Sequence, residues 1–187
     1  MQVHLPPSGD GSYISRVRMS TTPDEHKKDA PETLRCAVVT VSDTRTMETD
    51  TGGALIVEKL EEAGHSVHFR QIVPDEPSYI DNILDEMEQS SEIDVILFTG
   101  GTGISKRDQT YETITSRLTK VIPGYGELFR MLSYKEIGSA TMLSRTTGGL
   151  FQDKVLLTMP GSRAAVRLAM EEIILPELGH LIREARK

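Results

Sequence analysis

The sequence of 187 residues has no tryptophan, one cysteine, and no run that approaches the roughly 18 apolar residues of a membrane-spanning helix. A lone cysteine cannot form an internal disulfide, and Cys36 stands in the apolar run Cys36-Ala37-Val38-Val39. We therefore expect Cys36 to be a small buried residue rather than a nucleophile. The first 30 residues also lack the apolar centre of a secretion signal. These absences favour a cytoplasmic protein in a reducing compartment, with no membrane partner.

Excess positive charge is missing as well, because 21 Lys and Arg residues stand against 28 Asp and Glu residues, for a formal net charge of −7. This balance argues against a nucleic-acid partner, since a polyanion requires a basic surface. A small anion needs only a local group of cations and backbone amides. Hydrophobic residues make up 37% of the chain, which is enough for one globular domain with its own core.

Residues 1–33 differ in composition from the rest of the chain. They contain four prolines, scattered serine, threonine and charged residues, and no apolar periodicity. A segment of this kind buries too little apolar surface to offset the entropy lost on ordering. The sequence therefore predicts a disordered tail over residues 1–33 and one domain over residues 34–187.

Hydrophobic periodicity in the first half of the domain predicts strands that alternate with helices. The predicted strands cover residues 34–41, 65–73 and 93–99, and the predicted helices cover 51–63 and 77–90. Gly64 ends the first helix and Pro74 ends the second strand. This order is typical of an α/β fold that is doubly wound around a mostly parallel open sheet.

Proline and glycine divide the second half into shorter elements. We expect a helix over residues 111–118, a break at 123–126, a helix over 127–135, a hairpin over 148–159, and a long helix that is interrupted near Pro176 and ends near 185. The hairpin turn falls at Gln152-Asp153-Lys154, before the apolar strand that ends at Met159.

The most informative segment is an apolar strand that runs directly into a glycine loop, Gly100-Gly101-Thr102-Gly103. Its glycines permit positive φ and let backbone amides approach a phosphate without a Cβ in the way. Lys106 and Arg107 are placed to neutralise anionic oxygens, and Asp108 is placed to hold a hydrated Mg²⁺ that bridges them. The segment predicts an anion site with a carboxylate beside it.

Two familiar phosphate-binding motifs do not fit this loop. A P-loop requires glycine where Ser105 stands, and a dinucleotide fingerprint requires glycine or alanine where Lys106 stands. The remaining alternative is a tight strand-to-helix turn with exposed charges, which the loop taken alone does not exclude.

Other polar residues follow the predicted strands at the same edge of the sheet: Ser42-Asp43, Asp75 and Pro160-Gly161-Ser162. Ligands of open α/β sheets bind beyond the carboxyl ends of the strands, where strand order reverses. The amides of Gly161 and Ser162 offer a second anion cradle at a helix start. Each residue also has a plainer explanation, since Asp43 and Asp75 could be turn residues and Ser162 a helix cap. Together they predict metal-assisted phosphoryl or nucleotidyl transfer.

A second candidate pair lies on the helix predicted over 127–135. Glu127 and Arg130 face the same side at a spacing of three residues, which is typical of a surface ion pair but also suits a ligand contact. The nearby pairs Met131-Leu132 and Met142-Leu143 favour core packing or a subunit contact.

Seven segments in order resemble the molybdenum cofactor biosynthesis family MoaB/MogA, over about residues 34–181. They are Val41-Ser42-Asp43-Thr44-Arg45, Asp50-Thr51-Gly52-Gly53, Thr99-Gly100-Gly101-Thr102-Gly103, Lys106-Arg107-Asp108, Pro123-Gly124-Tyr125-Gly126-Glu127-Leu128-Phe129-Arg130, Leu143-Ser144-Arg145 and Met159-Pro160-Gly161-Ser162. The segment Glu127 to Ser133 is more similar to MoaB than to MogA. Gln109-Thr110-Tyr111 departs from the Val-Thr-Pro that is more usual in the family.

The resemblance implies a three-layer α/β/α fold that binds molybdopterin and, in competent members, adenylylates it with Mg-ATP and releases pyrophosphate. It implies a homotrimer or homohexamer, and other molybdenum cofactor biosynthesis proteins as partners. Asp75 and Asp108 match the two catalytic carboxylates of the family, with Asp108 as the metal ligand. The residues assigned to substrate binding are Ser42, Asp43, Gly100, Gly101, Thr102, Gly103, Lys106, Glu127, Arg130, Pro160, Gly161 and Ser162.

Three functions remain open from the sequence. The first is an adenylyltransferase that uses ATP, Mg²⁺ and molybdopterin. The second is a carrier or scaffold that binds molybdopterin without turnover. The third is a general nucleotide-binding or phosphosugar-binding α/β protein, which explains the loops but fewer of the matched residues.

Overall fold

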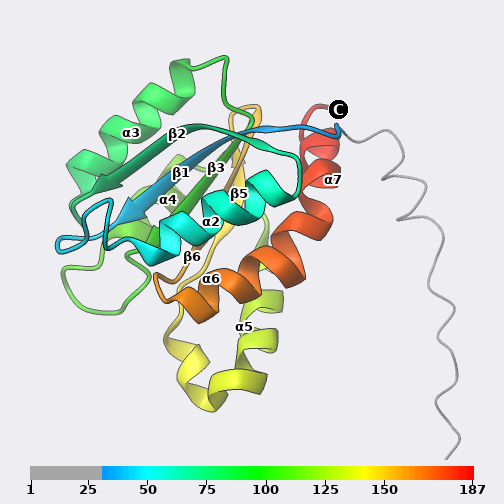
Figure 1. Ribbon diagram of the computed structural model, residues 1–187. Coiled ribbons are helices and arrows are strands. Elements are labelled where there is room, and N and C mark those ends of the chain that lie inside the picture. The colour runs from blue at the N-terminus through cyan, green and yellow to red at the C-terminus, as the bar shows by residue number, and fades with distance from the viewer. Residues whose placement is uncertain (1–30) are drawn as a thin grey trace, which may run out of the picture.

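A computed structural model describes residues 31–187, which form a six-stranded sheet with helices on both faces (Figure 1). The strands are β1 (Arg35–Val41), β2 (Ser66–Val73), β3 (Val95–Gly100), β4 (Lys120–Val121), β5 (Gly148–Phe151) and β6 (Lys154–Met159). The helices are α2 (Thr51–Glu62), α3 (Pro77–Gln89), α4 (Thr110–Arg117), α5 (Pro123–Ile137), α6 (Arg163–Ala169) and α7 (Leu175–Ala185). Residues 1–30 of the predicted tail lie outside the described residues.

The sheet has the strand order β2-β1-β3-β6-β5-β4, and its first four strands are parallel. β1 and β3 are buried along almost their whole length, which explains why both are continuous apolar runs rather than alternating ones. The chain leaves β1 toward β2 on one side and later returns to β3 on the other. The strand order therefore reverses between β1 and β3, which is where an open α/β sheet holds a ligand.

Two apolar cores fill the space between the sheet and its helices. Side chains of α2, α5, α6 and α7 pack on one face, and side chains of α3 and α4 pack on the other. Figure 1 shows the sheet between these two helical layers. The predicted three-layer α/β/α fold is thereby confirmed. Cys36 is fully buried in the first core, as predicted, and burial raises the pKa of its thiol to about 12.

The prediction that residues 123–126 break the chain before a helix is wrong, because α5 already begins at Pro123. Proline suits the first turn of a helix, where its missing N–H has no intrahelical partner and its φ is already helical. Gly126 has a packing reason to be glycine, since a Cβ there would collide with the Thr146 carbonyl oxygen. Glycine and proline here shape the start of a helix and do not end one.

The predicted interruption near Pro176 is confirmed, and it lies just before the proline without ending the helix. The helix continues from α6 through a π-helical segment, Met170–Ile174, into α7. The wider π turn precedes Pro176, so the chain accommodates a residue that cannot donate an i→i−4 hydrogen bond.

The antiparallel end of the sheet contains one strand more than the sequence predicts. The hairpin of β5 and β6 is confirmed, with Gln152 at φ 55° in its turn, but a short strand β4 also pairs with β5. Gly149 allows that pairing, because a Cβ there would collide with the Lys120 carbonyl oxygen. A 3₁₀ helix, Gly138–Leu143, follows α5 and was not predicted either.

The edge where the parallel strands begin is held together by Asp94, which is 4% exposed. Its carboxylate accepts hydrogen bonds from the Arg35 amide at 2.8 Å and from the Arg35 guanidinium at 2.8 and 3.0 Å, and it also pairs with Arg186. These contacts, those from Arg35 above all, hold the pKa of Asp94 far below its usual range. They tie β1 and the C-terminal helix to the start of β3. Within the described part of the chain, no helix has both the length and the apolar character needed to cross a membrane.

Candidate functional site

The carboxyl ends of β1, β3 and β6 meet at a cavity of about 200 Å³, which we call the switch-point cavity. Three predicted site residues line it: Ser42 after β1, Gly100 at the end of β3, and Gly161 after β6. The Thr99 hydroxyl donates to the Pro160 carbonyl at 3.3 Å and joins the last two loops. The structure thus brings together loops that are far apart in the sequence, as predicted.

The glycines of the loop after β3 are required by close packing. Gly100 and Gly101 have φ of +98° and +62°, in the left-handed region that favours glycine. A Cβ at Gly101 would collide with the side chain of Thr110, and a Cβ at Gly103 would collide with the carboxylate of Asp108. The glycine loop is therefore folded tightly over the start of α4.

Asp75 lies under this loop and is 9% exposed. Its carboxylate accepts a hydrogen bond from the Thr110 hydroxyl at 2.9 Å, and its amide donates to the Asp43 carboxylate at 3.3 Å. Burial raises the pKa of Asp75, and the negative charges of Asp108 and Asp43 add to that rise, while the Thr110 hydrogen bond opposes it. Asp75 is thus a carboxyl group whose ionised form the folded protein disfavours.

Asp108 differs from Asp75 in its surroundings. It is partly exposed, and its carboxylate accepts a hydrogen bond from the Ser105 amide at 2.8 Å. This hydrogen bond, helped by the nearby charge of Arg145, lowers the pKa of Asp108. The two candidate catalytic carboxyl groups are therefore neighbours whose pKa values are shifted in opposite directions.

Asp75 and Asp108 could hold a divalent cation only if a bound ligand supplied further oxygen atoms. Among residues 31–187 no group of three or more His, Cys, Asp and Glu side chains is arranged to hold a metal ion. Mg²⁺ characteristically takes one or two carboxylates and completes its shell with water and substrate phosphates. Asp75 and Asp108 are two such neighbouring carboxylates, although neither is among the residues that line the switch-point cavity.

The two cations after the glycine loop, Lys106 and Arg107, differ in their partners. Arg107 pairs with Asp43 at 2.9 Å and approaches Glu76 at 3.9 Å, so it neutralises carboxylates of the protein. Lys106 is exposed, with no ion pair among the described residues. Of the two predicted cations, Lys106 is the one that remains available to an anion.

Sequence reasoning missed Arg145, which connects the glycine loop with its surroundings. Its guanidinium donates to the Asp108 carbonyl at 2.6 Å, pairs with Glu112, and lies 5.3 Å from the centre of the Tyr111 ring. Its amide donates to the Thr102 carbonyl at 3.3 Å. The only signal for Arg145 in the sequence was its place in the segment Leu143-Ser144-Arg145.

Asp50 was missed as well, although it lines the switch-point cavity. It is 3% exposed and caps α2 by accepting the Gly53 amide at 2.8 Å. The same carboxylate accepts hydrogen bonds from the Thr40 hydroxyl at 2.8 Å and from Arg70 at 3.1 Å. Asp50 therefore fixes the start of α2 against β1 and β2 at the wall of the cavity.

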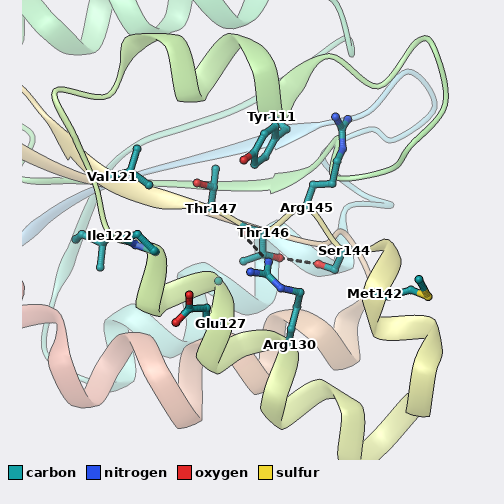
Figure 2. Close-up of a pocket in the computed structure, with 12 residues that line it drawn as sticks. Tyr111, Val121, Ile122, Glu127, Arg130, Met142, Ser144, Arg145, Thr146 and Thr147 are labelled. Atoms are coloured by element: carbon teal, nitrogen blue, oxygen red, sulfur yellow. Dashed lines mark hydrogen bonds between the residues drawn. The ribbon is translucent and has the colours of Figure 1, made fainter.

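A larger cavity of about 420 Å³, which we call the α5 cavity, lies between α4, α5 and the segment before β5. Figure 2 shows Tyr111 and Arg145 on one side, Glu127 and Arg130 on the other, and Thr146 between them. Arg130 donates to the Thr146 carbonyl at 3.2 Å, and no ion pair joins it to Glu127. The plainer explanation of this pair, a surface ion pair, is therefore wrong for the described structure.

A third cavity of about 220 Å³ lies between these two and is more apolar. The glycine loop contributes Thr102 and Gly103, and the loop after β6 contributes Pro160 and Ser162. Ser162 caps α6 by accepting the Ala165 amide at 3.2 Å, as predicted. The predicted site residues thus surround the glycine loop on several sides, but Glu127 and Arg130 belong to a different cavity from Ser42 and Gly161.

Known proteins are similar to this chain in sequence and in fold. Residues 37–180 match a protein family described as a probable molybdopterin binding domain. The chain is 52% identical over 165 residues to Molybdenum cofactor biosynthesis protein B of Halalkalibacterium halodurans, covering 88% of this chain and 97% of that protein. It is 49% identical over 164 residues to the protein of the same name from Bacillus subtilis, covering 87% and 96%.

Solved structures of similar proteins have a similar fold. A crystal structure of a Molybdenum cofactor biosynthesis protein B has a TM-score of 0.80 and 52% identity, covering 83% of this chain and 98% of the other. The tungsten cofactor synthesizing protein MoaB from Pyrococcus furiosus has a TM-score of 0.76 and 38% identity, covering 84% and 100%. A MogA structure has a TM-score of 0.73 and 29% identity, covering 81% and 99%.

Proposed function

This chain belongs to the MoaB/MogA family of molybdenum cofactor biosynthesis proteins, and on that premise we propose that it binds molybdopterin and adenylylates it with Mg-ATP. The observation that carries the proposal is the pair Asp75 and Asp108, which lie beside the glycine loop at the carboxyl edge of the sheet. Cavities open around this loop, so two substrates have room to meet there. The proposed reaction uses ATP, which agrees with the cytoplasmic location expected from the sequence.

The proposed step is a nucleotidyl transfer. A terminal phosphate oxygen of molybdopterin bonds to the α-phosphorus of ATP, and the bond from that phosphorus to the oxygen bridging the β-phosphorus breaks. Pyrophosphate leaves with the electron pair. Chemistry of this kind is mostly positioning and neutralisation of charge, so it asks for amides, cations and metal-binding carboxylates rather than for a protein nucleophile.

The residues divide this work between them. Asp108 and Asp75 would hold Mg²⁺, which when bound neutralises charge on the phosphate oxygens. Asp108 is ionised and partly exposed, so it is the stronger candidate for the metal contact. Glycine-loop amides and the amides at Gly161 and Ser162 would orient phosphate groups, and Lys106 would neutralise one of them. Ser42 and Asp43 lie at the same edge and would limit where a phosphate can sit.

The test is direct. Purified full-length protein is incubated with ATP, Mg²⁺ and molybdopterin, and the adenylylated product is identified by mass spectrometry while released pyrophosphate is measured in parallel. We expect equal amounts of both products and none without Mg²⁺. Molybdopterin binding without product, in folded protein, would overturn the proposed reaction and select the carrier or scaffold function.

The same proposal includes self-association into a homotrimer or homohexamer. α5 and the 3₁₀ helix after it carry six exposed apolar residues: Leu128, Met131, Tyr134, Ile137, Met142 and Leu143. Exposed apolar side chains gathered in one segment are the kind of surface that a subunit contact covers. We expect Met131→Glu to lower the mass measured by light scattering, and Lys135→Glu, on the same helix, to leave it unchanged. An unchanged mass in Met131→Glu would contradict the assignment of this face.

A further inference from the structure

Arg145 holds the glycine loop at two points. Its main-chain amide donates to the Thr102 carbonyl at 3.3 Å, and its guanidinium donates to the Asp108 carbonyl at 2.6 Å. The other terminal nitrogen of the guanidinium pairs with Glu112, in the first turn of α4. The segment from Thr102 to Asp108 is therefore fixed near both of its ends by one residue that lies 37 positions after Asp108 in the chain.

The guanidinium of Arg145 binds the backbone of Asp108 and not its carboxylate. That carboxylate accepts the Ser105 amide at 2.8 Å, and no arginine or lysine within residues 31–187 forms an ion pair with it. Asp94 and Asp43 differ in this respect, because arginines pair directly with their carboxylates. Arg145 thus places a positive charge close to Asp108 without occupying the oxygens that a metal cation would need.

Packing holds the guanidinium itself in place. Its central carbon lies 5.3 Å from the centre of the Tyr111 ring, and the side chain of Arg145 is only 22% exposed (Figure 2). A guanidinium is planar and presents its donors in a fixed fork, so it holds two acceptors in set directions. The Asp108 carbonyl is therefore fixed relative to the Glu112 carboxylate on α4. The single ammonium group of a lysine does not reproduce this geometry.

We propose that Arg145 is a positioning residue, which sets the direction of the Asp108 carboxylate toward Mg²⁺ by holding the Asp108 carbonyl. The inference rests on the proposed function, because it takes Asp108 as the metal contact, and it adds the residue that keeps this contact in place. Residues that orient a metal ligand commonly change metal affinity or activity by roughly 10–100-fold when they are replaced. Arg145 acts through Asp108 and makes no contact with the metal.

The experiment measures metal-dependent binding without turnover. Full-length protein is titrated by calorimetry with α,β-methylene-ATP, which cannot transfer its adenylyl group, once without Mg²⁺ and once with Mg²⁺ in excess. We expect Mg²⁺ to tighten binding to the parent protein and Asp108→Asn to abolish that gain. Arg145→Gln should weaken binding with Mg²⁺ by about tenfold and leave binding without Mg²⁺ unchanged. The matched control is Arg167→Gln, which removes the same charge from an exposed position on α6 and should change neither value.

Two further variants test the same link, and melting temperatures show which variants are folded. Arg145→Lys keeps the charge but not the fork, so it should recover little of the lost affinity. Glu112→Gln changes an exposed residue and weakens only the anchor of Arg145, so it decides the question if Arg145→Gln does not fold. It should weaken binding by about two- to threefold with Mg²⁺ and not without it. Parent-like affinity with Mg²⁺ in either variant would overturn the inference.

Other outcomes would overturn it as well. Equal losses with and without Mg²⁺ in Arg145→Gln would make Arg145 a direct contact of the nucleotide. A parent protein in which Mg²⁺ brings no gain would leave Asp108 without a metal to position. In turnover, Arg145→Gln should lower kcat by about tenfold or more and leave the KM for molybdopterin unchanged. A raised KM with an unchanged kcat would make Arg145 a contact of the pterin substrate instead.

Failure of this inference and failure of the proposed function give different results. If the parent protein adenylylates molybdopterin and Arg145→Gln does so with unchanged kcat, the reaction stands and the positioning role falls. If no adenylylation occurs but the Mg²⁺-dependent affinity for the ATP analogue depends on Arg145, the positioning role stands and the reaction falls.

Discussion

The two ends of strand β3 carry carboxylates in opposite electrostatic conditions. Asp94, just before the strand, is surrounded by Arg35 and Arg186, which satisfy it and hold its pKa far below the usual range. Beyond the other end, Asp75, which follows β2, is buried with a raised pKa beside the negative charge of Asp108. Asp94 is neutralised within the protein. Near the glycine loop Arg107 neutralises Asp43, but no cation among the described residues pairs with Asp75, so a bound cation would supply the missing charge.

This difference separates stability from chemistry. A carboxylate with its full set of partners lowers the free energy of the folded state, whereas carboxylates crowded together raise it. Residues at functional sites commonly carry such perturbed pKa values, since ligand binding relieves the unfavourable charge. Substitutions at the two ends should therefore change different measured quantities.

The largest expected effect is on turnover in Asp108→Asn. The amide keeps the size of the side chain and an acceptor for the Ser105 amide, but it removes the charge proposed to hold Mg²⁺. Loss of such a contact costs about 3–4 kcal/mol of transition-state stabilisation, or roughly 10²–10³ in rate. Stability should change by about 0.5 kcal/mol or less. Steady-state adenylylation assays and urea unfolding measure the two quantities.

Two results would contradict this prediction. Full activity in Asp108→Asn would make Asp108 a structural cap of its loop, as its hydrogen bond to Ser105 allows. Unfolding of the variant would mean that the charge itself is needed for stability, which would erase the contrast between the two ends of β3.

The next effect is on stability in Asp94→Asn. The substitution removes the charge that binds Arg35 and Arg186, and because both arginines are partly exposed they can return to solvent. We expect a loss of about 2 kcal/mol, or about 4–8 °C in melting temperature for a domain of this size. Activity per folded molecule should be unchanged. Glu92→Gln is the control, because this exposed residue contacts Arg35 only at 3.5 Å and should cost far less.

The stability contributed by Asp94 should disappear in acid. Its pKa is lowered in the folded state, so its contribution is complete above the unfolded-state pKa of about 3.9 and is lost as the pH falls below that value. The gap in unfolding free energy between the parent protein and Asp94→Asn should therefore be constant from pH 7 to 5 and shrink below pH 4. A gap that stayed constant to pH 2 would show that Asp94 acts through shape and not through charge.

The parallel half of the fold was predictable because each element has a strong local signal. Strands β1 and β3 are continuous apolar runs, and the amphipathic pattern of α3 identifies its buried face. The second half was not, because tertiary contacts decide it. Pro123 begins a helix, and β4 is two residues long and depends on close approach to Gly149.

The residues of the candidate site were likewise predictable only where a regular strand or helix positions them. Ser42, Gly100 and Gly161 end parallel strands, so topology alone predicted that they meet. Arg145 could not be placed in this way, since its contact with the Asp108 carbonyl depends on how the segment after the 3₁₀ helix returns to the glycine loop. Where a side chain reaches its partner through an irregular segment, periodicity carries no information about it.

The smallest change in stability, and the one of opposite sign, is expected in Asp75→Asn. The folded state raises the pKa of Asp75, chiefly by burial, so the protonated form is the favoured one. Its stabilising contribution is complete below the unfolded-state pKa of about 3.9 and is lost as the pH rises through the higher folded-state value. The asparagine amide keeps the acceptor for the Thr110 hydroxyl and has no charge to bury.

Asp75→Asn should therefore be slightly more stable than the parent protein at pH 7, and this advantage should vanish near pH 4. Asp94→Asn, by contrast, should be less stable than the parent at pH 7, and the difference should vanish in acid. Urea unfolding from pH 3 to 7 compares the two variants directly. A loss of stability in Asp75→Asn at pH 7 would mean that the buried carboxylate is compensated by the protein, and that the two ends of β3 do not differ in the way proposed.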